Sequence, residues 1–265
     1  KRQDMSWRFD NTGFHSGAFN MEYDEALAHA FANGSGEPTV RVYGWDPATI
    51  SVGWSQSFDE IDLKKAALES VDVVRRPTGG RAILHSDEVT YSVVMRSRGK
   101  KILAVYEDVS LALVQGLRKL GVDARLEKCQ PHFPSEYTKP SSAACFTSLA
   151  RYEIKIRDKK VVGSAQRRYS LGDGDEIVMQ HGSILLGPDH RRLVEFLNLD
   201  DKEKSRASEE LKQRTTDLSS ELCTRVEFDD VVDAVKHGFE EAWNISFESF
   251  TPTHLTSQMD HVQAL

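Results

Sequence analysis

The chain has 265 residues, in which 34 lysines and arginines stand against 41 aspartates and glutamates, so its formal net charge is −7 at pH 7. This balance excludes a globally basic nucleic-acid-binding protein, although local basic patches are compatible with it. The cysteines, Cys129, Cys145 and Cys223, are widely separated, which argues against a zinc site or a disulfide framework and fits a reducing compartment. No uncharged apolar run approaches the roughly 18 residues of a membrane span. We therefore expect a globular protein of the cytoplasm.

The first part of the chain predicts helices and strands in irregular alternation. Phe19, Tyr23, Leu27 and Phe31 recur at helical spacing, which predicts a helix over residues 18–32 with Asn20 as its N-cap. The other elements expected here are a first strand at 7–9, a strand pair at 39–43 and 49–54, and a short helix at 61–70.

Residues 71–94 contain a loop that is rich in glycine and arginine. Two β-rich runs, 71–74 and 89–94, flank the sequence Arg-Arg-Pro-Thr-Gly-Gly-Arg. Its two glycines permit positive φ and let the backbone approach a ligand closely. Its arginines, Arg75, Arg76 and Arg81, favour an anionic or strongly polar ligand over a plain surface hairpin.

The second part of the chain predicts strands followed by helices. An amphipathic helix is expected over residues 105–120, and the proline- and serine-rich residues 130–142 indicate a loop that leads to Cys145. The other expected elements are a hairpin of 151–156 with 160–164, a strand and the run 180–186, helices over 190–197 and 228–243, and a closing strand at 245–250. The highly charged residues 200–214 predict a solvated helix or a linker. The predicted class is α+β, with a mixed, mostly antiparallel β-sheet core flanked by helices.

Two side chains are candidates for chemistry on local grounds. Cys145 lies among small residues after the long loop, where a thiolate stabilised by a cation would be a nucleophile, and a buried structural cysteine is an equal alternative. Lys160 begins a strand that leads to a Gly-Ser turn, a pattern that by itself favours a solvated hairpin lysine.

The histidines His85 and His181 lie singly in apolar runs, where a hydrogen-bonded core or turn position is more common than a catalytic one. The sequence contains no His-Glu-x-x-His metal motif and no GxxxxGK[ST] phosphate loop.

Four motifs occur along the chain in one order: RRPTGGRAILHSDEVTYSV, SSAACF, KKVVGSAQRR and QHGSILL. Together they resemble the lipoate/biotin protein ligase superfamily. Within it, the chain is similar to the octanoyl-[acyl-carrier-protein]:protein octanoyltransferases built on the lipoate-protein ligase A-like scaffold. The resemblance covers roughly residues 7–250 and implies the catalytic-domain fold of that superfamily. We expect one catalytic domain over residues 1–265, with residues 187–265 as a C-terminal helical extension packed on it.

The resemblance implies acyl transfer in lipoate biosynthesis, with neither ATP nor a cofactor. A cysteine thiolate at the position of Cys145 takes octanoyl from the phosphopantetheine arm of acyl carrier protein. The acyl chain then passes to a specific lysine of a lipoyl domain, in glycine cleavage H protein or a 2-oxoacid dehydrogenase E2. The superfamily's lysine falls on Lys160, which is implied to hold the acyl carbonyl and to keep Cys145 ionised. We expect a monomer with no metal, nucleic-acid or membrane partner.

The resemblance also marks substrate-binding positions. Arg76, His85 and His181 match positions that shape the pocket, with no role in proton transfer. Backbone amides in two glycine turns are candidates to steady the oxyanion. The two turns are Gly79-Gly80 and Gly163-Ser164. The other substrate-binding candidates are Arg81 and Tyr91. The chain has Ala143 where such enzymes often have proline, which affects the rigidity of the loop before Cys145.

Two surfaces are expected around this site. An apolar slot for the acyl chain is predicted from Val73, Ile83, Tyr91, Val93 and Val161. Acyl carrier proteins and lipoyl domains are typically acidic, so a basic rim is predicted at the pocket mouth, consisting of Arg75, Arg81, Arg96, Arg98, Lys100, Arg167 and Arg168.

Two alternatives remain open from the sequence. The first is an ATP-dependent lipoate-protein ligase, which needs no cysteine; such ligases usually have a third glycine where this chain has Arg81, and an asparagine-rich motif where it has residues 88–92. The second is a non-catalytic relative that binds acyl or lipoyl carriers. Cys145 favours the transferase over the ligase, and the presence of both Cys145 and Lys160 favours it over the non-catalytic relative.

Overall fold

The computed structural model describes residues 6–128, 152–172 and 174–248. Eight strands form one sheet in the order β11-β1-β2-β6-β10-β9-β8-β7, and a smaller three-stranded sheet has the order β4-β3-β5. β1 is parallel to β2 and β11, whereas the other neighbours in the larger sheet are antiparallel. The predicted α+β class with a mixed, mostly antiparallel sheet is confirmed.

The predicted elements occur in the expected order, but β1 and β9 extend six residues beyond their predicted ends, and β5, β7 and α5 were not predicted. The strands of the larger sheet are β1 (Trp7–His15), β2 (Thr39–Trp45), β6 (Glu88–Arg96), β7 (Ala124–Lys128), β8 (Tyr152–Ile156), β9 (Lys159–Ser170), β10 (Glu176–Leu185) and β11 (Phe247–Glu248). Those of the smaller sheet are β3 (Thr49–Val52), β4 (Asp72–Arg75) and β5 (Ile83–His85). The helices are α1 (Gly17–Ala32), α2 (Leu63–Leu68), α3 (Ile102–Lys119), α4 (Asp201–Arg214), α5 (Leu218–Leu222) and α6 (Phe228–Trp243), with 3₁₀ segments η1 (Phe58–Glu60) and η4 (Pro188–Phe196).

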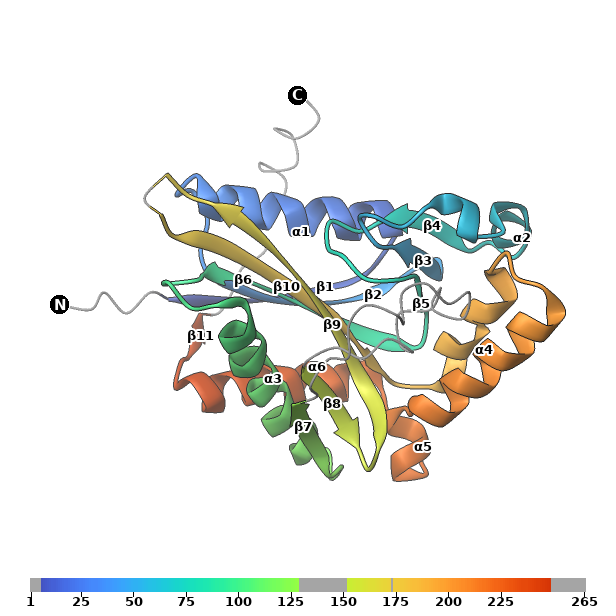
Figure 1. The fold of residues 1–265 in the computed structure, drawn as a ribbon. Helices are drawn as coiled ribbons and strands as arrows, with labels where there is room; N and C mark the ends of the chain where they lie inside the picture. Colours follow the sequence, from blue (N-terminus) through green and yellow to red (C-terminus); the bar gives the residue numbers. More distant parts are fainter. Residues whose placement is uncertain (1–5, 129–151, 173, 249–265) are drawn as a thin grey trace.

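The larger sheet is covered on both faces. Helix α1 lies along one face, and α3 and α6 lie against the other (Figure 1). Because side chains alternate along a strand, β6 serves both sides: Val89, Tyr91 and Val93 belong to the main core under α3 and α6. The alternate residues Thr90 and Ser92 therefore point toward the α1 face. Both sets are buried, so the strand supplies an apolar core on one side and polar groups on the other.

The smaller sheet packs against the C-terminal part of the chain. Ile50 of β3 and Leu84 of β5 share a second apolar cluster with Phe196 of η4 and Leu211 of α4. Helix α4 begins with a capping box, in which the side chains of Asp200 and Glu203 each accept a hydrogen bond from the other residue's backbone amide. This cap explains why a highly charged segment starts a helix there. Packing against η4 and α4 thus fixes the smaller sheet in place, with β3 and β5 next to the α1 face of the larger sheet.

Two local predictions are wrong. Asn20 is not the N-cap of the first helix, because the cap is Ser16, whose hydroxyl accepts from the Phe19 amide. Asn20 instead lies fully buried inside α1 and donates to the carbonyl of Gly44 at 3.0 Å. The segments 39–43 and 49–54 do not pair with each other, because β2 belongs to the larger sheet and β3 to the smaller one.

Helices α3 and α6 pack at van der Waals contact through two glycines. A Cβ added to Gly238 would lie 2.4 Å from the carbonyl oxygen of Ala112 and 2.6 Å from the amide nitrogen of Gly116. A Cβ added to Gly116 would lie 2.3 Å from the carbonyl oxygen of Ala234. These neighbours are backbone atoms, which cannot rotate away, so the two glycines set the distance between the helices.

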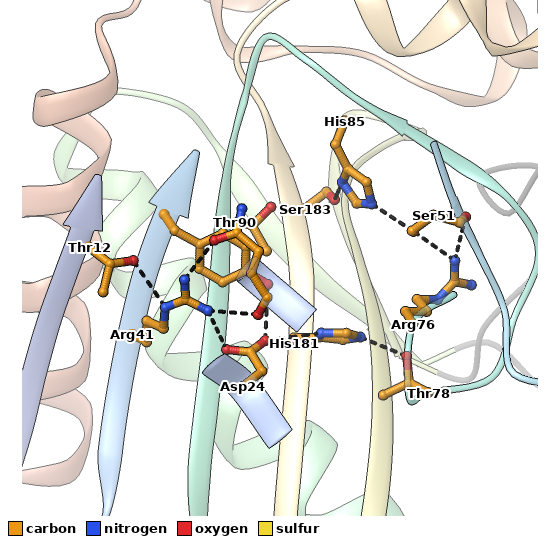
Figure 2. Close-up of polar contacts among 12 residues, drawn as sticks. Thr12, Asp24, Arg41, Ser51, Arg76, Thr78, His85, Thr90, His181 and Ser183 are labelled. Carbon is orange, nitrogen blue, oxygen red and sulfur yellow. Dashed lines mark hydrogen bonds and ion pairs between the residues drawn. The ribbon is translucent and has the colours of Figure 1, made fainter. Parts of the chain in front are cut away.

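A buried ion pair joins α1 to the sheet. Arg41 of β2 and Asp24 of α1 have no solvent exposure, and their Nη1 and Oδ1 atoms are 2.8 Å apart. Arg41 also donates from Nε to the Thr12 hydroxyl of β1 at 3.0 Å and from Nη2 to the Asn20 side-chain oxygen at 2.7 Å (Figure 2). The Tyr43 hydroxyl donates to the other Asp24 oxygen at 3.0 Å. One guanidinium therefore ties β1, β2 and α1 together.

Replacing Gly238 with valine should destabilise the fold. The new side chain meets backbone atoms of α3, and such overpacking typically costs about 1–3 kcal/mol. Urea unfolding monitored by circular dichroism measures the change. Gly172→Ala is the matched control, because a Cβ there meets nothing within 4 Å. Equal stability of the two variants would contradict the close packing of α3 and α6.

Replacing Asp24 with asparagine should remove about 3–5 kcal/mol of stability at pH 7, because it leaves the Arg41 charge buried without its counter-ion. Asp123→Asn is the control, since Asp123 pairs with Arg125 at the exposed surface; it should leave the unfolding midpoint unchanged.

The same carboxylate should make stability depend on pH. Burial raises the pKa of Asp24, but the Arg41 charge and the His181 hydrogen bond outweigh it and hold that pKa below the ordinary value. The unfolded chain therefore takes up this proton first as the pH falls below roughly 4, and the stabilisation is lost there. Urea midpoints between pH 3 and 7 should fall less steeply for Asp24→Asn than for the wild type.

Candidate functional site

A pocket with about 370 Å³ of empty space, open mouth included, lies between the smaller sheet and the α1 face of the larger sheet. Its walls come from α1, β2, β3, β5, β6, β9 and β10, together with the loop that follows β4. Residues that pair across β6, β10 and β9 line the pocket side by side: Ser183 of β10 pairs with Thr90 of β6 and with Gly163 of β9. The pocket is therefore built across strand register and joins segments far apart in the sequence.

The first polar group in the wall is His181, which connects the loop to the buried ion pair. Its Nε2 lies 2.6 Å from the Thr78 hydroxyl and its Nδ1 lies 3.4 Å from Asp24 (Figure 2). Because the carboxylate only accepts, we assign the proton to Nδ1, and Thr78 then donates to Nε2. Burial lowers the pKa of His181, against the opposing effect of Asp24, so the imidazole is neutral at pH 7.

The second polar group is His85, which is held on both ring nitrogens and on one face. Nδ1 lies 2.8 Å from Glu88 Oε1, and Nε2 lies 2.7 Å from the Ser51 hydroxyl. The ring stacks on Trp45 with centroids 4.0 Å apart and an interplanar angle of 14°. The Trp45 indole donates to Thr90 at 2.7 Å, and the Thr90 hydroxyl donates to Glu88 at 2.6 Å.

These contacts decide what kind of ligand the pocket accepts. The polar atoms of Ser51, His85, Thr90 and His181 bond to one another or to groups behind the wall. A ligand then meets mainly carbon, because paired polar groups offer it few directional bonds. The arrangement suits an apolar chain or ring.

The loop arginines are used within the protein. Arg76 donates to the carbonyls of Gly79 at 2.9 Å, Arg81 at 2.7 Å and Ser51 at 3.0 Å. Arg75 donates to three carbonyls between β3 and η1. Arg81 forms an ion pair with Glu60 at 2.7 Å. These bonds account for a loop that shapes the pocket wall, and only Arg76 of the three lines the pocket.

Close backbone packing explains why the loop contains glycine. Gly80 adopts φ 100, in the left-handed region. A Cβ on Gly53, just after β3, would lie 2.0 Å from the Gly80 carbonyl oxygen. The loop therefore lies directly on the end of β3: a side chain at Gly53 would displace it, and a side chain at Gly80 would strain the backbone.

A bulge in β9 decides where Lys160 points. Ile154 pairs with Val162 while the next residue, Lys155, pairs with Lys160, so β9 contributes one extra residue at this step. Paired residues share a face, and the bulge therefore puts Lys160 opposite to Val162. Gly163, the next residue after Val162, has that same orientation and lines the pocket. Without the bulge, Lys160 and Gly163 would point to opposite faces.

Lys160 is buried, contrary to the local expectation of a solvated hairpin lysine. Its exposure is 4%, and its Nζ lies 3.2 Å from Glu153 Oε1 on β8. Glu153 is equally buried and also faces Lys155 at 3.8 Å. The protein thus maintains a compensated cation on the pocket face of β9, although Lys160 is not among the residues that line the pocket described above.

The predicted site residues are partly brought together. Arg76, His85, Gly163, Ser164 and His181 line the pocket. Tyr91 lies outside the lining but its hydroxyl lies 2.7 Å from that of Ser164. Gly79, Gly80 and Arg81 belong to the loop but not to the lining. Cys145 and Ala143 lie outside the described residues.

Two surface predictions need correction. Of the predicted slot residues, Ile83 lines the pocket, whereas Tyr91, Val93 and Val161 point into the main core on the other face of the sheet. Val73 packs beside the second apolar cluster. The predicted slot differs because side chains of β6 alternate between the two faces of the sheet and because β9 contains a bulge. Neither feature is visible in the hydrophobicity of a single segment.

The predicted basic rim does not form one surface around the pocket. Arg96, Arg98 and Lys100 line a separate groove beside Trp7 and Trp243, at the far end of β6 from Thr90. Arg167 lies nearer the pocket, with its guanidinium 3.3 Å from the Pro77 carbonyl and 5.0 Å from the Trp54 ring centre.

Several residues of the site were not anticipated. Thr78 was within a motif, but its pairing with His181 spans 103 positions. Asp24, Ser51, Ser183 and Glu153 carry no signal in the sequence beyond their polarity, because strand register brings the last three to the site and the packing of α1 on the sheet brings Asp24.

In the part of the chain that the structure describes, no cluster of three or more His, Cys, Asp or Glu side chains suited to a metal ion occurs. None of the described helices has the length and apolar character needed to cross a bilayer.

Comparison with known proteins agrees with the fold and identifies the family. The Lipoyl protein ligase A/B catalytic domain model matches residues 16–240. The chain is 39% identical over 260 residues to Octanoyltransferase LipM of Kyrpidia tusciae, covering 96% of this chain and 92% of that protein. It is 36% identical over 255 residues to Octanoyltransferase LipM of Bacillus subtilis, covering 94% and 90%.

Solved structures resemble the chain in fold. The bipartite lipoate protein ligase of Thermoplasma acidophilum superposes with a TM-score of 0.77 at 24% identity, covering 98% of this chain and 92% of that one. Lipoate-protein ligase A bound with ATP gives 0.75 at 23% identity, covering 98% and 94%. At this identity the likeness concerns the fold alone. The family match and the two curated relatives together establish that the chain belongs to the lipoyl protein ligase A/B catalytic domain family.

Proposed function

We propose that the protein is an acyltransferase of lipoate biosynthesis that transfers an octanoyl group to a lysine of a lipoyl domain. The observation that carries this proposal is the similarity, over at least 90% of each chain, to relatives named octanoyltransferase. The pocket supports it independently. Its polar side chains are paired within the wall, so the surface that it offers suits an alkyl chain.

The proposed donor is octanoyl-acyl carrier protein, and the proposed nucleophile is the Cys145 thiolate. Attack on the thioester carbonyl would release the phosphopantetheine thiol and leave octanoyl on Cys145. The neutral amine of the acceptor lysine would then attack this thioester, form an amide and release the thiol. The first exchange converts one thioester into another, and the second yields a more stable amide, so the sequence of steps needs no ATP. Support for Cys145 comes from the sequence resemblance.

The burial of Lys160 supports a role in the same reaction. Its ammonium is on the pocket face of β9 and is compensated by Glu153 at 3.2 Å. A fixed cation stabilises a carbonyl oxygen as negative charge develops on it, and it does so best where water is excluded. We assign Lys160 this role and Glu153 the role of a positioning residue that neutralises and orients it.

Cys145→Ala should reduce ATP-independent octanoyl transfer by at least about 10³-fold, because it removes the nucleophile. The assay combines the protein with octanoyl-acyl carrier protein and an apo lipoyl domain, and intact mass measures both proteins. Wild type should also carry an octanoyl adduct when the acceptor is omitted. Cys223→Ala is the matched control, since Cys223 is exposed, and it should keep full activity.

The opposite result identifies the alternative enzyme. If Cys145→Ala still modifies the lipoyl domain from free lipoate and ATP, the protein is a lipoate-protein ligase. A wild type that binds both carriers but transfers nothing would make it a non-catalytic relative.

Lys160→Met should lower the rate of octanoyl transfer by about 10²–10³-fold, the usual effect of losing one oxyanion-stabilising donor. It should also reduce stability, because Glu153 stays buried without its partner. The control is Lys159→Met, whose side chain is exposed and donates to the Lys212 carbonyl. Lys160→Met/Glu153→Gln should recover stability but not the rate. Recovery of both would mean that Lys160 is purely structural.

A further inference from the structure

Three side chains at the pocket have the geometry of a nucleophile, a base and an orienting carboxylate. The Ser51 hydroxyl lies 2.7 Å from His85 Nε2, and His85 Nδ1 lies 2.8 Å from Glu88 Oε1 (Figure 2 shows the serine and the histidine). Both distances lie within the range in which a base takes a proton from a serine and a carboxylate holds the imidazole. All three residues are at least 95% buried.

The hydrogen bonds assign the proton positions that such a system needs. Glu88 is acceptor-only when ionised, so Nδ1 of His85 carries the proton. Nε2 is then unprotonated and accepts from the Ser51 hydroxyl. Burial raises the pKa of Glu88, but its electrostatic interaction with His85 and the hydrogen bonds from His85, Thr90 and Ser183 outweigh burial and lower that pKa. The carboxylate is therefore ionised at neutral pH and able to stabilise an imidazolium.

A fourth group stabilises negative charge on the serine oxygen. Arg76 Nη1 donates to Ser51 Oγ at 3.0 Å and to the Ser51 carbonyl oxygen at 3.0 Å. The same guanidinium is immobilised by the loop carbonyls of Gly79 and Arg81. A serine hydroxyl has two lone pairs. One accepts from Arg76, and the other is available to attack a carbonyl carbon.

Three of these groups stand in the pocket wall. Ser51, Arg76 and His85 line the pocket, whereas Glu88 lies behind His85. At rest the Ser51 hydroxyl is bonded to His85, so a bound chain meets mainly carbon. When a carbonyl carbon lies beside Ser51, transfer of the hydroxyl proton to His85 makes the serine oxygen available for attack, and the orienting carboxylate stays shielded behind the imidazole.

We propose that Ser51, His85 and Glu88 form a second acyl-transfer centre, in which Ser51 is acylated by medium-chain acyl thioesters or esters independently of Cys145. The apolar pocket sets the class of acyl group. The family resemblance implies only a pocket-shaping position for His85, with no role in proton transfer; its contacts with Ser51 and Glu88 give it one here.

The reaction balances with groups that are present. The Ser51 hydroxyl gives its proton to His85 Nε2 while Oγ bonds to the carbonyl carbon. The carbon–sulfur bond then breaks, and the leaving thiolate takes the proton from His85. The products are an octanoyl ester of Ser51 and a free thiol. Hydrolysis to octanoic acid needs one water molecule, activated by His85. Because Ser51 is buried, we expect this second step to be slow and the ester to accumulate.

The test uses Cys145→Ala protein, so that the proposed transfer through Cys145 neither helps nor interferes. The probe is an octyl fluorophosphonate, which reacts covalently with base-activated serines. We expect one phosphonate per chain by intact mass, mapped to Ser51 by peptide analysis. With p-nitrophenyl octanoate, we expect a burst of about one equivalent of nitrophenol followed by slow turnover.

Two variants on the Cys145→Ala background assign the roles. Ser51→Ala should abolish labelling, and Glu88→Gln should slow it by about 10²-fold or more. Ser92→Ala is the matched control, because Ser92 is also buried on β6 and lies outside the pocket lining; it should label like the parent. Thermal unfolding of each variant establishes that the comparison is between folded proteins.

Three outcomes would overturn the proposal. These are no labelling of folded Cys145→Ala protein, labelling that persists in Ser51→Ala, and an unchanged labelling rate in folded Glu88→Gln. None of them bears on whether Cys145 carries octanoyl to a lipoyl domain, and the proposal would in turn survive the failure of that function.

Discussion

The buried ion pair between Arg41 and Asp24 is the interaction on which the site depends. Arg41 arises from a central strand of the larger sheet, and Asp24 from the helix above it. Two charges at full burial are stable only if every polar partner is in place, and here Thr12 and Asn20 supply the remaining acceptors. The position of α1 over the sheet is therefore determined by directional bonds and not only by apolar contact. Since α1 forms one wall of the pocket, its geometry follows from this pair.

Hydrogen bonds connect this ion pair to the glycine-rich loop. Asp24 orients His181, and His181 accepts from Thr78 in the loop. Arg76 continues the chain of contacts by fixing the loop to β3. The pocket wall is thus a continuous polar network that connects α1, β10, the loop and β3. A wall of aliphatic side chains would repack around different ligands. A network in which each group has its partner holds one shape and still presents carbon to the ligand.

The sequence predicts much of the fold but little of this network. Helices α3 and α6 and the β8–β9 hairpin are expected from periodicity and turn residues, since these signals are local, whereas the charged segment of α4 was equally compatible with a linker. The separation of β2 from β3 into two sheets is not predictable in this way, because both segments are equally strand-like. Motif resemblance identifies Arg76, His85 and His181, yet their partners Ser51, Glu88 and Asp24 become visible only when the strands are in register. The orientation of Lys160 has the same origin, because one extra residue in β9 reverses it.

Placement of several reactive groups along one pocket has a physical reason. The loop and β3 must approach closely, as the contact between Gly53 and the Gly80 carbonyl requires, and this brings Arg76 against Ser51. The chain enters β6 immediately after β5, which places Glu88 behind His85. Lys160 reaches the same face of the sheet from β9, where Glu153 compensates its charge. Backbone packing that closes the apolar pocket therefore also brings Ser51, His85 and Arg76 together in its wall, with Lys160 on the same face of the sheet. In the acyl transfer proposed above, these groups are placed to act on the carbonyl carbon of the acyl chain.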